Sequence, residues 1–362
     1  MIVFTMKYTG TVYIVYDGQA GDCGKGKFTG LFAHLKDISI SINNNTAGAD
    51  HTFVFDNGKR VTTSNLPIAV VSPKVEYLVI GAGASINPTQ LNIEIDTYMD
   101  LLRQRKIYVH KRAAIVLPSH ISTEQNEIKS GSTFKGSGAA FADKILRKPG
   151  VILAGNYKDW HPRVELIDDS FIESVLNGEK SFSGGENILI ETSQGFDLDI
   201  NHGLEYPYVT SHQCTPAQAL ADCGLPHNIK TETYMLIRPY PIRISNDSNQ
   251  GCIYSGNYGE SKEITWDEIE ILSGIKNLAK KEKTPDTNAT RRVFEFNETR
   301  FKRAISLTNP NYVILNFAQY LGKDLNKFIE KLKKQFNVNI AYIGTGEKFS
   351  DYLKVDISKA LM

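Results

Sequence analysis

The sequence predicts an α/β protein with a mostly parallel central sheet, formed as a single domain over residues 1–362. Short apolar segments alternate with segments of helical period, as at 12–16 followed by 28–35. The strand-like segments end in loops rich in glycine or polar residues, the places where α/β proteins bind ligands. No linker-like change of composition divides the chain, which favours one domain with long functional loops over two domains.

The most informative segment is 12–27, VYIVYDGQAGDCGKGK. Its first five residues are apolar enough for one buried strand, a glycine-dense turn follows, and apolar residues then recur at helical spacing. A strand, a glycine loop and a helix in this order are typical of a phosphate site, because N–H groups at the helix start point at the anion. The alternative is a glycine-rich turn with solvated lysines. The candidate phosphate ligands are Gly21, Gly24, Lys25, Gly26 and Lys27.

Asp22 is the most unusual residue of this loop. Residues 21–27 fit the spacing G-x-x-x-x-G-K, but Phe28 stands where a Ser or Thr would hold magnesium, which argues against an ordinary nucleotide hydrolase. Phosphates repel a neighbouring carboxylate unless it binds a metal ion or moves a proton. We therefore expect Asp22 to do one of these.

Further elements follow the same rhythm. Strands are predicted at 38–42, 53–55, 77–80, 114–117, 188–190, 312–315 and 338–343, the last one ending at the glycines of 344–346. Helices are predicted at 92–102 and from 325, where Asp324 is the expected cap. His51 lies in a polar loop and is as readily catalytic as structural. The loop 129–144 could bind a second phosphate, although composition alone favours a flexible surface loop, and 283–292 is predicted to be a mobile loop whose arginines suit a carboxylate.

Charge and composition exclude several classes of protein. The chain has 41 Lys and Arg against 40 Asp and Glu, so it lacks the basic surface that a nucleic acid polymer requires. Neither a membrane-spanning apolar run nor a signal peptide is present, and the four cysteines form no C-x-x-C pair. We expect a soluble cytoplasmic protein.

Five motifs, met in order from about Val12 to Leu353, make the sequence resemble the adenylosuccinate synthetase family. GDCGKGK at 21–27 resembles the family's GDEGKGK, and TAG with HT at 46–52 resembles its N-A-G-H-T. RAAIVLPSH at 112–120 resembles R-A-P-L-I-L-P-Y-H, and GST with GSGAAFADK at 131–144 resembles the second loop. ETSQGFDLDINHGLEYPYVTS at 191–211 resembles E-G-A-Q-G-x-L-L-D-I-D-x-G-T-Y-P-Y-V-T-S.

The resemblance implies a ligase that condenses a 6-oxopurine nucleotide with L-aspartate, using a nucleoside triphosphate and Mg²⁺. The 6-oxygen is first phosphorylated and then displaced by the aspartate amine. Asp22 would take the proton from purine N1 and contact the metal, and His51 would stabilise the transferring phosphoryl group. Lys25 and the glycine amides would neutralise phosphate charge, and the carbonyl of Gly48 would be a second magnesium ligand.

The resemblance also implies the remaining contacts with small-molecule substrates. The purine monophosphate would be held by Thr46, Ser132, Thr133, Gln194 and Thr210, with Arg147 reaching across a homodimer interface, and Gln194 also counts among the catalytic residues. The triphosphate would contact Asn311 and Gly344 besides the phosphate loop, and L-aspartate would contact Thr287, Arg291 and Arg292.

Three departures from the family pattern bear on the substrates. The guanine-reading T-K-x-D appears here as TNPN at 308–311, and Asn311 cannot repeat the two-hydrogen-bond contact of a carboxylate with guanine, so ATP or dATP is favoured over GTP. The aspartate loop T-T-G-R-x-R-R becomes TNATRR at 287–292 and lacks the first arginine. Thr46 replaces an asparagine, and two residues are inserted before His51.

The loss of guanine reading in a shortened chain resembles the phage branch of the family, the 2-aminoadenylosuccinate synthetases, which join dGMP and aspartate on the way to 2,6-diaminopurine DNA. If the protein is viral, its location is the host cytoplasm. Asp22 points the other way, because many of that branch carry a serine there, which makes room for the guanine 2-amino group. We expect dGMP first and IMP, the substrate of ordinary adenylosuccinate synthetases in AMP biosynthesis, second. A nucleotide-binding paralogue without ligase activity is the third reading; the intact Asp22, Lys25, His51 and Gln194 weigh against it.

Overall fold

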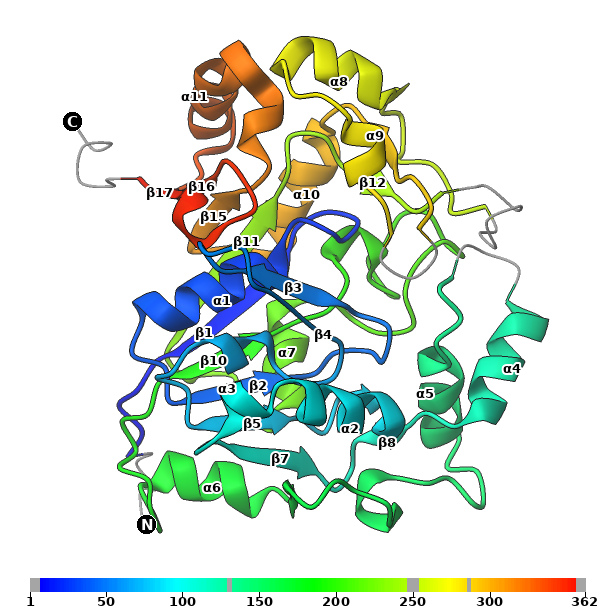
Figure 1. The fold of residues 1–362 in the computed structure, drawn as a ribbon, viewed down its shortest axis with the longest axis vertical. Helices are drawn as coiled ribbons and strands as arrows, with labels where there is room; N and C mark the ends of the chain where they lie inside the picture. The colour runs from blue at the N-terminus through cyan, green and yellow to red at the C-terminus, as the bar shows by residue number, and fades with distance from the viewer. Residues whose placement is uncertain (1–6, 129–131, 246–253, 285–287, 356–362) are drawn as a thin grey trace.

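The computed structural model describes residues 7–128, 132–245, 254–284 and 288–355 (Figure 1). A ten-stranded sheet forms its centre, in the order β17-β16-β15-β11-β1-β10-β2-β5-β7-β9. The strands are β1 (Val12–Asp17), β2 (Ile40–Asn43), β5 (Tyr77–Ile80), β7 (Lys106–His110), β9 (Val164–Ile167), β10 (Ile188–Glu191), β11 (Thr231–Ile237), β15 (Tyr312–Leu315), β16 (Ile340–Gly344) and β17 (Tyr352–Lys354). All neighbouring pairs are parallel except β16 and β17. The predicted α/β class with a mostly parallel sheet is confirmed.

Alternate side chains of β1 enter two different cores. Tyr13 and Val15 pack with the apolar side of α1 (Lys25–Leu35) and with α2 (Pro88–Thr97). Val12 and Ile14 face the opposite core, which α6 (Ser170–Asn177) and α7 (Pro216–Asp222) cover. A parallel strand with helices on both faces has no wet side, so all six residues of β1 are buried.

A third core lies under the carboxyl-terminal half of the sheet, in the upper part of Figure 1. There α10 (Glu298–Thr308) and α11 (Leu325–Phe336) pack against β11, β15 and β16. The small sheets are β3 (His51–Val54) with β4 (Arg60–Thr63), β6 (Ser85–Ile86) with β8 (Ala114–Ile115), and β14 (Arg292–Phe294) between β12 (Ile242–Arg243) and β13 (Glu263–Ile264). The other helices are α3 (Met99–Leu102), α4 (Pro118–Glu127), α5 (Ser137–Ile145), α8 (Trp266–Ser273) and α9 (Leu278–Lys281), with short 3₁₀ turns at Ile68–Val71, Ala154–Asn156, Phe196–Leu198, Ala318–Asp324 and Phe349–Asp351.

Several predicted boundaries are wrong. The helix predicted at 92–102 is two helices broken at Tyr98, and only two residues of 114–117 form a strand, in a separate small sheet. The second half of the loop 129–144 is helical, because α5 begins at Ser137. Asp324 precedes α11, but its side chain makes no capping hydrogen bond. The last strand is β17, since residues 352–354 turn back along β16.

One edge of the sheet collects the loops of interest. The carboxyl ends of β1, β2, β10, β11 and β15 lie at this edge because these strands are parallel. The loops that follow them begin at Gly18, Asn44, Thr192, Arg238 and Asn316. Within the described ranges, no helix has both the length and the apolar character needed to cross a bilayer.

Candidate active site

The phosphate loop between β1 and α1 has the predicted strand, loop and helix form. Gly21, Asp22 and Gly24 all have positive φ, of 87°, 55° and 82°. Asp22 thus adopts a backbone conformation that costs a non-glycine residue energy, and such residues concentrate at functional sites. A Cβ atom at Gly26 would lie 2.8 Å from the Cβ of His51 and 2.6 Å from the backbone nitrogen of Thr52. Only glycine at position 26 therefore lets the start of α1 lie directly against His51.

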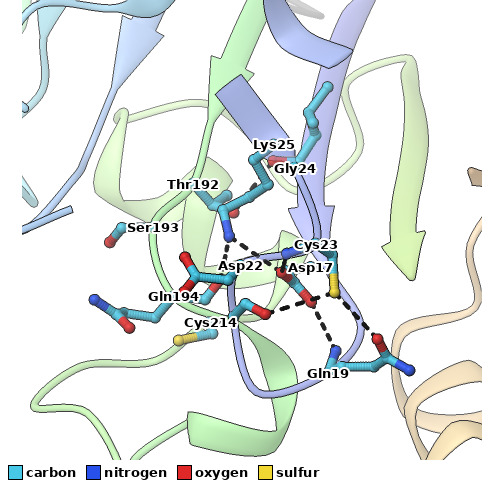
Figure 2. Close-up of polar contacts among 12 residues, drawn as sticks. Asp17, Gln19, Asp22, Cys23, Gly24, Lys25, Thr192, Ser193, Gln194 and Cys214 are labelled. Carbon is cyan, nitrogen blue, oxygen red and sulfur yellow. Dashed lines mark hydrogen bonds and ion pairs between the residues drawn. The ribbon is translucent and has the colours of Figure 1, made fainter. Parts of the chain in front are cut away.

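Both lysines of this segment make contacts within the protein, and neither is fully exposed. Lys25 is buried, its Nζ lies 3.4 Å from Asp17 Oδ2, and it also donates to the carbonyl of Gln194 (Figure 2). Lys27 donates to the carbonyl of Gly346, in the loop that follows Gly344, and its Nζ is 4.3 Å from the centre of the Tyr352 ring. Burial lowers the pKa of Lys27 to about 8, against the opposing effect of nearby carboxylates. The structure therefore excludes the reading of this segment as a turn with solvated lysines.

His51 is held by a buried carboxylate that the sequence analysis did not single out. Its Nδ1 contacts Oε1 of Glu191, the last residue of β10, which is fully buried. The other oxygen, Oε2, accepts a hydrogen bond of 3.0 Å from the backbone N–H of Ile68. A carboxylate on Nδ1 fixes the ring and leaves Nε2 as the nitrogen for a substrate. The signal in the sequence that could have identified Glu191 is a charged residue at the end of an otherwise apolar strand.

Asp22 contacts the loop that was predicted to bind L-aspartate. Its Oδ2 accepts from Nε of Arg291 at 2.7 Å, and Arg291 also donates to the carbonyl of Lys283. Partial burial by itself would raise the pKa of Asp22, but the guanidinium of Arg291, aided by Lys25 and Arg238, holds that pKa below its ordinary value. The structure thus brings together a proposed proton acceptor and a proposed aspartate ligand.

The neighbouring Arg292 is engaged elsewhere. Its Nε lies 2.8 Å from Oε1 of Glu263, on β13, and its Nη2 pairs with the other oxygen of the same carboxylate. Arg292 is therefore part of a two-hydrogen-bond pair, and its role toward aspartate stays a prediction. Thr287, the third predicted aspartate ligand, lies outside the described residues.

The predicted purine monophosphate ligands line one cavity of about 350 Å³. Its walls include Thr46, Ser132, Thr133, Gln194 and Thr210, together with the proposed metal ligand Gly48. Arg147 is absent from this lining. It follows α5 with a positive φ of 53° and an exposed side chain, and its role in another copy of the chain stays a prediction.

The second loop is anchored by Glu124, which also lines the cavity. This buried carboxylate accepts hydrogen bonds of 2.8 Å from Gly136 N–H and 2.7 Å from Gly138 N–H. A Cβ at Gly48 would lie 3.2 Å from Thr133 Oγ1, so the two loops touch. From residue 132 onward, the described part of this loop forms one wall of the cavity.

The comparisons with known proteins agree with this geometry. The family model of adenylosuccinate synthetase matches residues 14–155 and 153–251. The chain belongs to the adenylosuccinate synthetase family. It is therefore related to ligases that form a carbon–nitrogen bond, as predicted.

Two viral relatives of this family match most of the chain. The N6-succino-2-amino-2′-deoxyadenylate synthase of Salmonella phage PMBT28 is 35% identical over 86% of this chain and 86% of its own length. The enzyme of that name from Acinetobacter phage SH-Ab 15497 is 29% identical, over 92% of this chain and 91% of its own. Adenylosuccinate synthetase of Pyrococcus sp. (strain ST700) is also 29% identical, over 92% and 95%.

The solved structures give the same picture. Succinoaminodeoxyadenylate synthetase of cyanophage S-2L, bound to dGMP and to dATP as an energy donor, superposes with a TM-score of 0.85 at 30% identity over 97% of both chains. Adenylosuccinate synthetase of Plasmodium falciparum shares the fold, with a TM-score of 0.78 at 18% identity over 96% of this chain and 100% of the other.

The structure corrects the position of Asn311. This residue directly precedes β15, whereas the phosphate loop lies at the carboxyl ends of the strands. Its Oδ1 accepts from the N–H of Thr233 at 2.8 Å and from the hydroxyl of the same residue at 3.0 Å. Asn311 therefore joins β15 to β11 at the amino end of β15. This end lies opposite the phosphate loop, so Asn311 is not placed to contact a triphosphate. The position of Asn311 therefore gives no reason to exclude GTP.

The residue that does reach the phosphate loop from β15 is Asn316, at the other end of the strand. Its Nδ2 donates to the carbonyl of Cys23 at 2.6 Å, and its buried Oδ1 has no hydrogen-bond partner among the described residues. A Cβ at Gly344 would come within 2.4 Å of that same oxygen. Asn316 and Gly344 thus lie together beside the phosphate loop.

Proposed function

We propose that the protein is a ligase that joins L-aspartate to the 6-position of dGMP, with ATP or dATP as phosphoryl donor, and forms N6-succino-2-amino-2′-deoxyadenylate. The observation that carries this proposal is the match over nearly the whole chain to the cyanophage enzyme bound to dGMP and dATP. The phage relatives of the same name support it. They also favour the cytoplasm of an infected host as the place of action.

The site contains the groups that the first step needs. Asp22 takes the proton from purine N1, the electron pair moves to the 6-oxygen, and this oxygen attacks the γ-phosphorus of the triphosphate, whose bond to the β-phosphate breaks so that the nucleoside diphosphate leaves. His51, fixed by Glu191, presents Nε2 to the transferring group, and Lys25 with the N–H groups at the start of α1 offsets negative charge. In the second step the aspartate amine attacks C6, and the phosphate leaves with the 6-oxygen.

Magnesium fits the residues present. Asp22 offers a partly exposed carboxylate and Gly48 a backbone carbonyl on the cavity wall, both hard oxygen donors. Among the described residues, no cluster of three or more His, Cys, Asp or Glu side chains could hold a metal by itself. Mg²⁺ usually binds to one or two carboxylates together with substrate phosphates, where it offsets their charge.

The monophosphate and its dimer contact form the second part of the proposal. The cavity lined by Thr133 and Thr210 receives dGMP, and Arg147 of a second copy of the chain completes it. Ile145 and Leu146, directly before Arg147, are 74% and 63% exposed. Large apolar side chains at this position are suited to burial against a partner subunit.

L-Aspartate is expected near Asp22. Arg291 is paired with Asp22. It is therefore placed to leave this carboxylate and bind a carboxylate of the substrate instead. For the base of the triphosphate, we propose the segment that begins at Asn316 in place of Asn311.

IMP is the second candidate purine, and the observation that favours it is Asp22 itself. This carboxylate occupies the position where a smaller side chain would leave room for a 2-amino group. The experiment crosses dGMP and IMP with ATP, dATP and GTP in the presence of L-aspartate and Mg²⁺, and identifies products by mass. A succinylated diaminopurine deoxynucleotide made with ATP or dATP supports the proposal. Adenylosuccinate from IMP alone would replace dGMP by IMP, and no product from any pair would favour a nucleotide-binding protein without ligase activity.

A further inference from the structure

Asp17, the last residue of β1, lies at the centre of the hydrogen bonds that shape the phosphate loop (Figure 2). It is fully buried. Its Oδ1 accepts from the N–H of Gln19 at 2.9 Å, and its Oδ2 accepts from the N–H of Cys23, also at 2.9 Å. These two hydrogen bonds tie the beginning of the loop to its end.

The same carboxylate is paired with the buried ammonium of Lys25. Nζ of Lys25 is 3.4 Å from Oδ2 of Asp17, and the side chains are 4% and 0% exposed. The other contact of this ammonium is the carbonyl of Gln194, on the loop after β10. Asp17 thus helps to fix Lys25 between the two loops that carry the proposed catalytic groups.

The turn alone does not require a charge at this position. After β2, Asn43 makes the equivalent contact with a neutral amide, since its Oδ1 accepts from the N–H of Asn45 at 2.8 Å. A buried carboxylate is far more costly than a buried amide unless a cation compensates it. The charge of Asp17 is therefore explained by Lys25 rather than by the turn.

At position 23 this chain lacks a carboxylate that the family motif has. The family motif GDEGKGK has a glutamate there, and this chain has Cys23, whose buried thiol donates to Gln19 Oε1 at 3.1 Å. The loop thus lacks the motif's second carboxylate but has one at Asp17, six residues earlier.

We propose that Asp17 is a positioning residue that holds the ammonium of Lys25 in place for the phosphates. The inference rests on the proposed role of Lys25 in offsetting phosphate charge. It concerns how this chain orients Lys25 and does not depend on which purine is bound.

Enzyme assays test the proposal with Asp17→Asn, which keeps an acceptor for one backbone N–H and removes the charge. We expect kcat to fall by about 10- to 100-fold with KM for the purine monophosphate within about threefold of wild type, because the loss of a charged partner affects Lys25 and not the cavity. In a Lys25→Met background, the same change should lower kcat no further. A wild-type kcat for Asp17→Asn would overturn the proposal.

A stability measurement tests the pair without any substrate, and so separates this inference from the proposed reaction. Lys25→Met leaves Asp17 charged and buried without a cation, and it should lower the urea midpoint clearly. Adding Asp17→Asn should restore much of that loss, so that the two changes are not additive. If the two substitutions shift the urea midpoint additively, Asp17 serves the turn alone. The same conclusion follows if Asp17→Asn does not fold even together with Lys25→Met.

Discussion

The contact between His51 and Glu191 occupies Nδ1 of the ring and leaves Nε2 for the proposed substrate. Both side chains are buried, and Glu191 also accepts from the backbone of Ile68. We predict that Glu191→Gln lowers kcat by about 10²-fold while the KM values change little, because an amide holds the ring less firmly and removes the negative charge beside it. Steady-state kinetics with each substrate varied in turn measure this effect.

Glu94 provides the matched control for Glu191. It is equally buried, and it accepts backbone N–H groups of Ser64 and Leu66 without touching a proposed catalytic group. Glu94→Gln should lower the melting temperature and leave kcat of the folded protein near wild type. An equal loss of kcat in both variants would mean that Glu191 acts through stability alone.

The ion pair between Arg291 and Asp22 predicts a change in the pH profile. Burial raises and Arg291 lowers the pKa of Asp22, with a net value below the ordinary one. Without Arg291 the pKa should rise, so Arg291→Ala should move the acidic limb of kcat/KM to higher pH, because Asp22 accepts a proton only when ionised. The same sign applies to stability: the contribution of the pair is present above the unfolded pKa of aspartate and is lost as pH falls through the lowered pKa.

Arg292→Ala is the control for this pH profile. Arg292 is paired with Glu263, whereas Asp22 is paired with Arg291. Its substitution can raise the KM for aspartate but should leave the acidic limb in place. An unmoved limb in Arg291→Ala would show that Asp22 is not the group that must lose a proton.

Single residues also show where sequence reasoning ends. Asp22 and Lys25 follow from the glycine-rich segment after β1, and His51 follows from the separate segment after β2. Their partners Asp17 and Glu191 are charged residues at strand ends, and only the folded chain shows that they contact Lys25 and His51. The error at Asn311 has the same origin, because a short motif cannot say which end of a strand it occupies.

At the scale of elements, the close packing of α1 on β3 gives a prediction. A methyl group at Gly26 would overlap the backbone of Thr52, which cannot move as a flexible side chain would. Gly26→Ala should therefore lower the free energy of unfolding by about 1–3 kcal/mol and reduce kcat, because it pushes His51 away from the phosphate loop. Urea denaturation and kinetics on the same preparation measure both.

Gly185→Ala is the corresponding control. Among the residues that the structure describes, a Cβ there meets the hydroxyls of Ser183 and Thr9, at 3.4 Å and 3.5 Å, which is ordinary contact. Stability and kcat should both stay near wild type. If Gly26→Ala also left stability and kcat near wild type, the close contact between α1 and β3 would not be needed for either.

The elements differ in how much of them the sequence reveals. β1 and α1 were predicted closely, because each has a strong apolar period and a glycine loop divides them. The strand β11, next to β1, was missed because its first residues, TET, are polar although the strand lies in the middle of the sheet. β17 was missed for another reason: three partly exposed residues become a strand only by pairing with β16.

At the scale of the whole molecule, the strand order brings the site together. β1 lies between β10 and β11, so the phosphate loop meets the loop of Gln194 on one side and Arg238 on the other. The sequence predicts parallel strands but not their order, since order depends on how the crossover helices pack. The sheet takes strands from Val12 through Lys354, and one domain for residues 1–362 stays a prediction.

The proposed homodimer gives a test that depends on the whole assembly. If Arg147 completes the site of a second copy, dimers of Asp22→Asn chains and dimers of Arg147→Ala chains are both inactive. In the first, each site lacks its own Asp22; in the second, each site lacks the Arg147 that the other subunit should supply. In a mixed dimer, one site combines an intact Asp22 with an intact Arg147 from the partner. Refolded equimolar mixtures of the two inactive proteins should therefore recover about a quarter of the wild-type activity, since half of the dimers are mixed and half of their sites are intact. No recovery in a mixture that light scattering shows to be dimeric would place Arg147 outside the partner's site.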